Sequence, residues 1–519
     1  MTDASESTAS PPPAAPETVL AHGHLHPAIL LLRLLDALKQ AGLPVIVGIA
    51  LQNVWFIAFG CVTFVLQLGY AVARYLTLEF TLTSEELRVR EGLLQRQERR
   101  IPLDRIQDLG LESSLLRRAL GLCVVMVETA SGRGVEARLD ALSWPAAEHL
   151  RQVLLDARTH ATAAAAVASD PGSPQPSAEP GPPAPPSPEW LVHRATTGEL
   201  LLRGVTDLRL SAVVVTGFAA LQLADQLGFA ARVSGLADGA RNWLLQFSPL
   251  VTAALLIAVL MLVIGAGVVS ATLGNLVQFH GFALTLRDSV LQRRYGLLTT
   301  RQKTLPRARI QRVTIEQPWL RRLFGVASVK ADSAGGSRSE GEDSAGGFDV
   351  VVPLTRLDRA NALLPALLPG IENEPPVWQS GSGRLVLRTT LQGAVLAAIA
   401  AAGLSTQATI PTGLALLLVP VWALLGVLIW RNLAYAAGGD FLFLQHGLIG
   451  RTAAFLPMPK VQTVVVRQSP FAQLLGLADL TVYVAGGSPT CLPHLLAADA
   501  RALANTIAQQ AAVAAARDW

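Results

Sequence analysis

The chain carries few charged residues, few aromatic residues and only three cysteines. Asp, Glu, Lys and Arg make up 15% of its 519 residues, whereas a soluble globular protein carries about 25%. The deficit of charge fits long stretches that face lipid, as does a mean hydropathy of +0.40. Cys61, Cys123 and Cys491 stand far apart and form no zinc-binding spacing, which argues against a disulfide framework or a structural zinc site.

The sequence also lacks the motifs of common catalytic sites. It contains no Gly-x-Ser-x-Gly, no His-Glu-x-x-His, no P-loop and no pair of carboxylates at a repeated position, so none of these chemistries is indicated. His22, His24 and His26 alternate near the N-terminus, but they stand without neighbouring cysteines or carboxylates. We therefore predict a protein that is not an enzyme, with no catalytic residue and no need of a cofactor or metal.

Three apolar zones are long enough to cross a membrane. Gln40–Ala73 has no charged residue, and neither has Thr389–Trp430. The middle zone divides into two spans, Leu210–Ala230 and Leu250–Leu273. Because a transmembrane helix needs about 20 apolar residues, each zone predicts a pair of helices, with a break near Gln52–Asn53 in the first. The expected hairpins, with six spans in all, cover residues 28–74, 207–279 and 385–431.

A repeated motif follows each hairpin. A Gly is followed by Pro after ten positions, by Gln after five more and by a second Gly after another fourteen, three times without a gap. This agreement indicates a chain built three times from one module. The residues that define the repeat are Gly92, Pro102, Gln107 and Gly121, then Gly296, Pro306, Gln311 and Gly325, then Gly447, Pro457, Gln462 and Gly476.

The residues around each motif alternate between apolar and polar types, which is typical of β-strands. Tyr75–Thr83, Phe282–Leu286 and Phe441–Leu444 show this period of two. Short strands about ten residues apart favour an antiparallel sandwich or open barrel. A helix-forming stretch at the end of each copy predicts a closing helix. The predicted fold class therefore joins α-helical membrane hairpins to three β-rich domains, each with a C-terminal helix.

The β-rich domains are expected over residues 75–160, 280–369 and 432–519, with a flexible insertion at 332–348 in the second. Residues 1–27 are rich in Ser, Ala and Pro and predict a disordered lead. Residues 161–189 form a Pro/Ala-rich linker. Such compositions cannot bury a core, so we expect neither segment to belong to a packed domain.

The repeated motif resembles the bacterial pleckstrin-homology (PH) domain of the YdbS/YdbT membrane-protein family. That pattern joins a Tyr-x-Leu-Thr strand, a Gly-Leu-Leu turn, Ile-Pro-x-x-Arg-Ile-Gln and Leu-x-Arg-x-x-Gly-Leu. The first copy matches throughout, the second matches in most positions, and the third keeps its Gly, Pro and Gln anchors but loses most basic residues. Three copies, each after a hairpin, resemble the longer, YdbT-like members. The resemblance implies a PH-like fold and little about activity, since a fold does not determine function.

The second copy is strongly basic. Between Arg287 and Lys330 it has eleven Lys and Arg residues against two acids. Each basic residue near an anionic lipid surface contributes about 1 kcal/mol to binding, so the cluster favours a contact with lipid headgroups. Flanking charge of the positive-inside kind is the alternative. The candidate lipid-facing residues are Arg293, Arg294, Arg301, Lys303, Arg307 and Arg309.

Basic residues also mark the ends of the predicted spans, on the side of the β-rich domains. They are Arg33, Lys39, Arg74, Arg203, Arg209, Arg287, Arg384, Arg388 and Arg431. The positive-inside rule therefore places the three domains and both termini in the cytoplasm. Together with the resemblance, this predicts a multi-pass protein of the bacterial cytoplasmic (inner) membrane.

We expect this protein to act as a scaffold that binds membrane lipids or partner proteins. The resemblance suggests a role in envelope maintenance or stress tolerance, and a membrane-protein partner such as a one-domain paralogue; an oligomer is left open. Nucleic acid is not expected, since aromatic residues do not alternate with the basic ones. The alternative is a subunit of a transporter or export system. That function needs polar groups along a path, and Asp225 is the one carboxylate within the predicted spans.

Overall fold

A computed structural model gives the structure of residues 19–517, apart from 25, 51, 84–85, 92–96, 104–105, 130–134, 152–188, 208–234, 236–238, 240–245, 288, 334–348, 372–376, 405–411, 439 and 486–488. The chain forms two compact units. The first is Met1–Pro186 with Arg301–Thr304, and the second is Ser187–Thr300 with Leu305–Trp519. The predicted linker 161–188, the span Leu210–Ala230 and most of the insertion lie outside the described residues.

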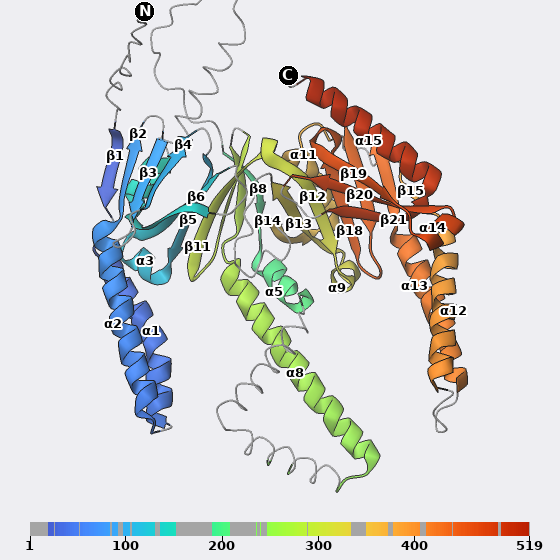
Figure 1. The fold of residues 1–519 in the computed structure, drawn as a ribbon, viewed down its shortest axis with the longest axis horizontal. Helices are drawn as coiled ribbons and strands as arrows, with labels where there is room; N and C mark the ends of the chain where they lie inside the picture. The colour runs from blue at the N-terminus through green and yellow to red at the C-terminus, as the bar shows by residue number, and fades with distance from the viewer. Residues whose placement is uncertain are drawn as a thin grey trace, which may run out of the picture. The chain divides into compact units, whose positions relative to one another are not determined.

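The first unit begins with a helical hairpin. Helices α1 (Ile29–Ala50) and α2 (Val54–Thr77) lie side by side (Figure 1). They meet where the sequence predicted a break, and the Asn53 side chain caps α2 by accepting a hydrogen bond from the Trp55 N–H at 3.0 Å. A Cβ atom at Gly60 would stand 2.6 Å from Val45 Cγ2, so this glycine permits the close helix contact that membrane hairpins favour.

The strands of the first unit belong to two antiparallel sheets. The first has the strand order β1-β2-β3-β4 and the second holds β5, β6 and β7. Arg301–Thr304 also belong to this unit. The strands are β1 (Val19–His24), β2 (Glu79–Thr83), β3 (Glu86–Glu91), β4 (Gln97–Pro102), β5 (Ile106–Ser114), β6 (Leu122–Thr129) and β7 (Val135–Ser143). Residues 144–151 form the closing helix. Leu82, Leu87, Val125 and Leu139 are among the side chains of the buried core.

Strand β1 corrects one expectation. Residues 1–27 were predicted to be a disordered lead, but Val19–His24 pairs antiparallel with β2 on the far side of the hairpin. The same arrangement recurs in the second unit, where β8 (Trp190–Arg194) pairs with β9 (Ala283–Arg287). The two-residue strand β15 (Gln379–Ser380) likewise pairs with β16 (Ala434–Gly438). Each module therefore starts one strand before its hairpin, because the chain enters and leaves the membrane helices at neighbouring strands.

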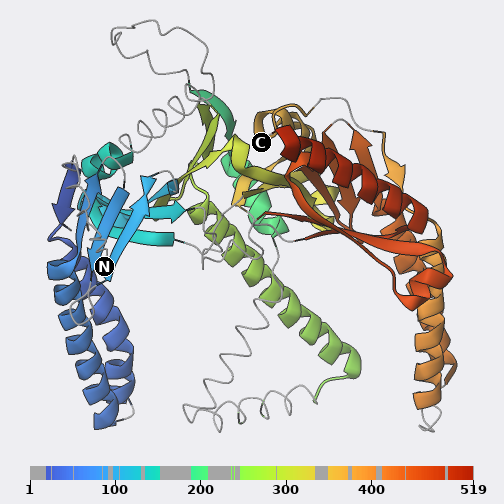
Figure 2. The same cartoon turned by 45° about the horizontal axis from the view of Figure 1, so that its top comes forward.

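The second unit contains the other long apolar helices. They are α8 (Pro249–Gln278), α12 (Arg384–Leu404) and α13 (Leu418–Asn432), with the shorter α5 (Thr197–Thr206) packed on α8. Gly204 of α5 makes this contact close, since a Cβ there would stand 2.3 Å from Thr272 Cα. In both views of the ribbon, α8 and the α12–α13 pair leave the β-strands of this unit on the same side (Figures 1 and 2).

Four helices of the described residues are long and apolar enough to cross a membrane. They are Val54–Thr77, Pro249–Gln278, Arg384–Gly403 and Ala415–Asn432, with mean hydropathies between 1.6 and 2.7. Their large apolar side chains face outward, as the exposed fractions of Trp55 (80%) and Leu250 (81%) show. Six spans were predicted. Of the remaining two, one lies outside the described residues, and the other is α1, which carries Arg33, Asp36 and Lys39 in its first half.

A strand pair joins the second module to the third. The strands of the second module are β8 to β14, and those of the third are β15 to β21. Their remaining bounds are β10 (Val290–Tyr295), β11 (Thr299–Pro306), β12 (Ile310–Gln317), β13 (Val326–Ser333), β14 (Asp349–Arg356), β17 (Phe441–His446), β18 (Arg451–Pro457), β19 (Val461–Arg467), β20 (Leu477–Val484) and β21 (Thr490–Leu496). Strand β12 pairs antiparallel with β18, with Val313 opposite Phe455. One seven-stranded sheet therefore runs β14-β13-β12-β18-β17-β16-β15 across both modules.

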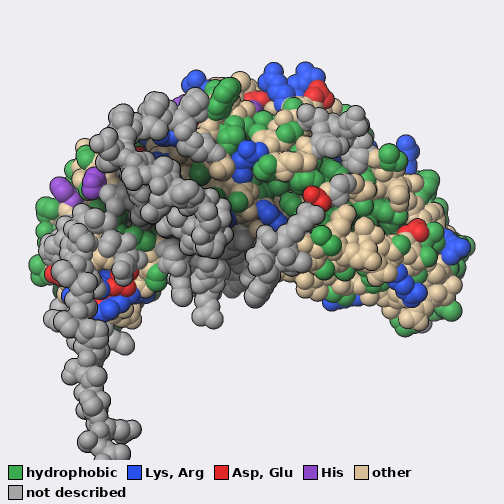
Figure 3. Space-filling model, turned by 90° about the horizontal axis from the view of Figure 1, so that it is seen from above, with side chains coloured by type: hydrophobic (Ala, Val, Ile, Leu, Met, Phe, Trp, Pro, Cys, Tyr) green, Lys and Arg blue, Asp and Glu red, His purple; other side chains and the backbone are tan. Residues whose placement is uncertain are grey.

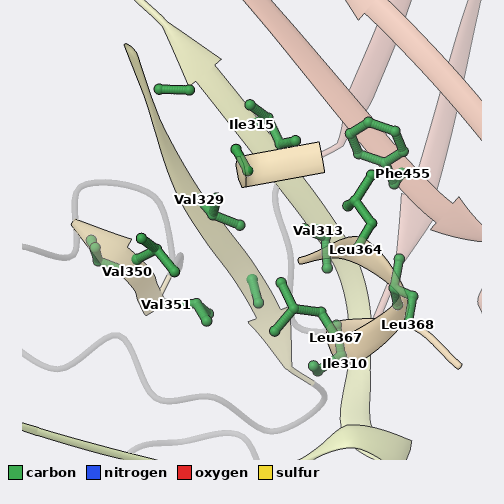
Figure 4. Close-up of a cluster of buried hydrophobic side chains, with 14 of the residues drawn as sticks. Ile310, Val313, Ile315, Val329, Val350, Val351, Leu364, Leu367, Leu368 and Phe455 are labelled. Atoms are coloured by element: carbon green, nitrogen blue, oxygen red, sulfur yellow. The ribbon is translucent and has the colours of Figure 1, made fainter. Parts of the chain in front are cut away.

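This shared sheet separates two hydrophobic cores. On one face, Val313, Ile315 and Phe455 pack with Leu364 and Leu367 of the closing helices α10 (Leu357–Ala362) and α11 (Leu364–Leu367) (Figure 4). Its other face carries Leu442, Leu444, Ala454 and Leu456, which belong to the core of the third module with β19–β21 and α15 (Ala497–Arg517). The core of the second domain is therefore completed by residues of the third, whereas the core of the third consists of residues of its own module.

The anchors of the sequence motif are structural. In all three copies the Gln stands at a β-bulge, where the pairing skips Gln107, Gln311 and Gln462. Gln311 also donates a hydrogen bond to the Arg309 carbonyl at 3.2 Å. Each Pro is the last residue of its strand, β4, β11 or β18, and in the second and third copies a 3-10 turn follows it.

The second Gly of each motif takes a left-handed backbone conformation. The φ angles are +69° at Gly121, +63° at Gly325 and +65° at Gly476. Each carbonyl then accepts the N–H of the residue that opens the closing helix, Trp144, Leu357 or Ala497, at 2.9–3.1 Å. Since other residues adopt this φ only with strain, the glycine sets where the closing helix begins.

Candidate functional site

In the first unit, arginines join the hairpin to the β-domain. The buried Asp140 of β7, whose side chain is 2% exposed, lies 2.7 Å from Arg33 of α1 and 3.5 Å from Arg74 of α2. Arg138 stands 3.0 Å from the same carboxylate. The sequence predicted Arg33 and Arg74 only as flanking charge. In the structure they connect both helix ends to one strand of the β-domain.

The second unit makes the same connection with other partners. Arg203 of α5 donates to the Asn275 side chain of α8 at 2.9 Å and to the Pro353 carbonyl of β14 at 2.7 Å, and it lies 4.1 Å above the Phe279 ring. Pro353 and Asp140 each stand four residues before the closing helix of their module. Arg203 and Arg33 therefore reach corresponding places on the last strand.

The third module uses Arg388, in the second turn of α12, which hydrogen-bonds the His494 ring on β21 at 2.6 Å. Asp479 of β20 holds His494 in turn, at 2.7 Å from its backbone N–H and 3.0 Å from its ring. His494 has a φ of +63°, which is uncommon outside glycine and costs about 1–3 kcal/mol. In each module, therefore, an arginine of the helix that follows the first strand makes a polar contact with the last strand.

A cavity opens between α1 and α2 beside the Asp140 cluster. Its volume is about 350 Å³, and its walls combine Arg33, Asp36, Gln40, Gln67, Tyr70 and Arg74 with Ile29, Ala37, Leu66, Ala71 and Tyr75. Gln67 donates to Gln40 across the hairpin at 2.7 Å. The volume is at the lower end of the range of about 300–1,000 Å³ for ligand pockets.

Exposed apolar side chains gather on two repeated elements, which we call the membrane-facing rim. One is the short helix after β5, β12 and β19, namely α3 (Leu115–Ala119), α9 (Trp319–Leu323) and α14 (Pro470–Leu474). The other is the Gly-Leu-Leu turn before β11 and β18. The described rim residues are Leu115, Leu116, Leu120, Leu297, Leu298, Trp319, Leu323, Phe324, Leu448, Ile449, Phe471 and Leu474, and the exposed fraction reaches 76% at Leu323 and 83% at Leu474.

Hydrogen bonds place the rim of the second unit at the ends of the long helices. The Leu297 N–H donates to the Val277 carbonyl in the last turn of α8 at 2.9 Å. Arg322 of α9 donates to the Asn432 side chain at the end of α13, also at 2.9 Å. Arg384, which opens α12, donates to the Leu475 carbonyl next to α14 at 3.1 Å. These rim residues therefore lie where the chain enters and leaves the apolar helices (Figure 1).

The six arginines and lysines predicted to face lipid occupy different environments. Of these six, Arg294 is exposed and the others are half-buried. Arg293 donates to the Val350 carbonyl at 2.6 Å and lies 5.5 Å from the Tyr295 ring centre. Arg307 donates to the Pro365 carbonyl at 2.6 Å, and burial lowers its pKa below the usual value. Arg301 lies 3.8 Å from Glu112 within the first unit.

Other basic residues of the second copy also bind protein groups. Arg312 is 3% exposed and pairs with Asp332, and Arg321 lies 3.5 Å from Asp207. Lys330 lies 2.7 Å from Glu316. On the face drawn in Figure 3, Lys and Arg occur in small separate groups among apolar and neutral side chains. Much of the basic charge that distinguishes this copy in sequence therefore contributes to internal packing.

Comparison with known proteins agrees with this repeated architecture. The family described as Bacterial PH domain matches residues 30–158, 230–369 and 387–511, one match for each module. The chain belongs to the bacterial PH domain family. It is similar to the UPF0699 transmembrane protein YdbT of Bacillus subtilis (strain 168), with 25% identity over 441 residues that cover 83% of this chain and 84% of that protein. No solved structure matches.

These matches confirm the predicted resemblance, the repeat and the combination of membrane helices with PH-like domains. Among the described residues, no group of His, Cys, Asp and Glu could hold a metal ion. Asp225 lies outside the described residues. Sequence reasoning did not find the rim, although a signal was present. Leu-Leu follows the first Gly in two copies and Leu-Ile in the third, and apolar residues on a turn need an apolar environment.

Replacing Asp140 by Asn should loosen the first hairpin from its domain. Arg33 and Arg74 then lose a charged acceptor, and a hydrogen bond to a charged group contributes about 1.5–3 kcal/mol. We expect a loss of about 2 kcal/mol in local stability, measured by hydrogen exchange of the β7 amides in the full chain. Arg90→Gln is the control, since it breaks an exposed pair with Glu98 at 3.1 Å. Equal effects of the two variants would contradict the role given to Asp140.

The contact at Asp479 predicts a loss of stability in acid. Burial acts to raise the pKa of Asp479, but hydrogen bonds from the His494 side chain and backbone outweigh it, so the pKa lies below its usual value. A lowered pKa means that this stabilisation is complete above the unfolded pKa of about 3.9 and is lost as pH falls through the folded pKa. The protection of the β20 and β21 amides, which is their exchange rate relative to the intrinsic rate at the same pH, should therefore fall more steeply below that pH in wild type than in Asp479→Asn. Identical pH profiles would rule the contact out as the cause.

Proposed function

We propose that this protein is a non-enzymatic membrane scaffold whose PH-like domains are held against the cytoplasmic leaflet and bind lipids or partner proteins there. The observation that carries the proposal is the membrane-facing rim. Large exposed apolar side chains recur on the same two elements of the repeated module. Large exposed apolar side chains that gather on one element mark membrane or protein interaction sites.

The position of the rim favours lipid as the surface that covers it. In the second unit the rim adjoins the residues at which α8, α12 and α13 begin or end. Trp319 and Phe324 stand there with Arg322, and aromatic rings and arginines are the side chains that prefer the interface between headgroups and hydrocarbon. Apolar residues at this depth leave water on contact with the bilayer, which stabilises the docked position of the domain.

The contacts at Asp140, Arg203 and Arg388 support the same function. They link each hairpin to its β-domain through buried or half-buried polar groups. A domain that is linked to its membrane helices has little freedom to turn away from the bilayer. This arrangement suits a platform with a fixed orientation better than a domain that searches for a distant ligand.

The basic residues of the second copy form a further part of the proposal, with Arg294 as the side chain best placed to meet a lipid headgroup. The second domain cannot be tested alone, because Phe441, Phe443 and Phe455 of the third module complete its core.

In the full chain, Arg294→Gln should weaken phosphatidylglycerol binding about fivefold, as expected for about 1 kcal/mol per charge. Native mass spectrometry in mild detergent at two salt concentrations measures this binding. Arg467→Gln, an exposed arginine of the third domain, is the matched control. An equal loss of binding in both variants would leave Arg294 without a specific role.

The rim itself can be tested by its depth in the bilayer. Single cysteines at Leu323 and Leu474, labelled with an environment-sensitive fluorophore in nanodiscs, should show blue-shifted emission and quenching by spin-labelled lipids. A cysteine at Asn505, exposed on α15, is the control and should show neither. Unquenched emission at both rim positions would mean that the rim faces water or a protein, and that the lipid contact is wrong.

A further inference from the structure

Strand β19 is the counterpart in the third module of β5 and β12, because each follows its motif Pro and carries the motif Gln at a bulge. Strand β12 has a partner on both sides, β13 and β18. Strand β19 pairs with β20 alone among the described residues and ends the sheet β19-β20-β21. The edge that β12 uses to pair with the next module therefore has no partner strand on β19 among the described residues.

The side chains of β12 and β19 differ in exposure, as expected if only β12 is covered by a following module. Arg312 and Thr314 of β12 are 3% and 4% exposed, and Arg312 reaches Thr490 in the following module. At the corresponding positions of β19, Thr463 is exposed and Val465 is half-buried. The face that the next module covers on β12 is thus uncovered on β19.

Strand β19 also lacks the usual protection of an edge. Natural edge strands carry lysine, proline or inward-pointing charge that prevents pairing with another chain. The sequence Val-Gln-Thr-Val-Val-Val-Arg has neither proline nor lysine, and its single charge is at the end. Thr463 and the three valines that follow it are β-branched residues at successive positions, which favours pairing with a further strand.

A complementary edge exists at the other end of the same chain. Strand β4 is the counterpart of β18, since each ends at the motif Pro, and it is the last strand of the sheet β1-β2-β3-β4. The side chains of Gln97, Glu98, Arg99 and Arg100 are exposed. These side chains are polar, but polarity does not prevent pairing at this edge. Residues Arg301–Thr304 at the corresponding positions of β11 are polar too, and they belong to the first unit, where Arg301 lies 3.8 Å from Glu112 of β5.

We propose that β19 of one copy pairs antiparallel with β4 of a second copy, so that the modules of successive chains continue the same arrangement head to tail. The pairing of β12 with β18, where Val313 faces Phe455 and Thr314 faces Ala454, supplies the register. Counted from the motif anchors, Val464 then faces Arg100, Val465 faces Arg99 and Val466 faces Glu98 of the second copy.

The membrane allows this assembly. Within the second unit, the joint between β12 and β18 leaves α8 and the α12–α13 pair on one side of the strands (Figures 1 and 2). A second copy added through the same kind of joint at β4 therefore keeps its first hairpin on that side and in the same bilayer. The interface joins two different surfaces, so it yields dimers and longer species unless it closes into a ring. The pairing does not depend on whether the rim contacts lipid.

Disulfide crosslinking between two separately purified chains tests the register. In a background of Cys61→Ser, Cys123→Ala and Cys491→Ser, one chain carries Val465→Cys and the other Arg99→Cys. Mixed in nanodisc-forming lipid at equal amounts, they should give a crosslinked heterodimer under mild oxidation. Replacing Arg99→Cys by Arg90→Cys is the control, because Arg90 is exposed but lies on β3, one strand further from the joint.

Mass photometry of the full chain with its three native cysteines supplies the second measurement. Dimers and larger species should appear with rising concentration, and Val465→Lys and Thr463→Lys should abolish them. Thr463 is exposed, so its replacement leaves the core intact. Cys491→Lys, which adds the same charge to the other outer strand β21, should not affect them. A monomer at all concentrations, or equal crosslinking at Arg99 and Arg90, would overturn the proposal; the monomer would assign the β19 edge to a different protein.

Discussion

The structure of the second unit depends on backbone pairing between β12 and β18. This pairing turns two neighbouring sheets into one, and the combined sheet then forms the wall between two hydrophobic cores. Phenylalanines on β17 and β18, with Ala436 of β16, complete a core whose other residues come from the preceding module. Because the interior of a protein tolerates few voids, the third module cannot move away without opening the core of the second. The repeat therefore produces a continuous body from modules that look separate in sequence.

Arginine has a structural role that its distribution in the sequence does not reveal. Arg33, Arg203 and Arg388 each flank a predicted membrane span, and each also binds the last strand of its own domain. Their partners differ, being a carboxylate, a backbone carbonyl and an imidazole. The guanidinium group suits all three because it stays charged and offers five donors in a planar fork. An arginine that sequence reasoning treats only as flanking charge thus also attaches the domain to its helices.

Local features of the fold were predictable from the sequence, and non-local ones were not. The hairpin break at Asn53 and the closing helices follow from capping and propensity, and the repeat follows from Gly, Pro and Gln at fixed distances. The strand β1 was missed because a six-residue segment next to a low-complexity lead carries little periodicity. The pairing of β12 with β18 joins residues about 140 positions apart, and no local pattern encodes it. The rim was missed because exposed leucines on a turn look like core residues until the chain is folded.

The strands that precede the hairpins have a consequence for how the protein folds. Strand β1 ends at His24 and its partner β2 begins at Glu79, so in a free chain their pairing must close a long loop, whose entropic cost rises with the logarithm of its length. Insertion of α1 and α2 into the bilayer removes this cost, since an antiparallel hairpin returns the chain to the surface beside its point of entry. The membrane then acts as a folding template. Each sheet is nucleated at the bilayer surface, and a module whose hairpin fails to insert has no short route to its first strand pair.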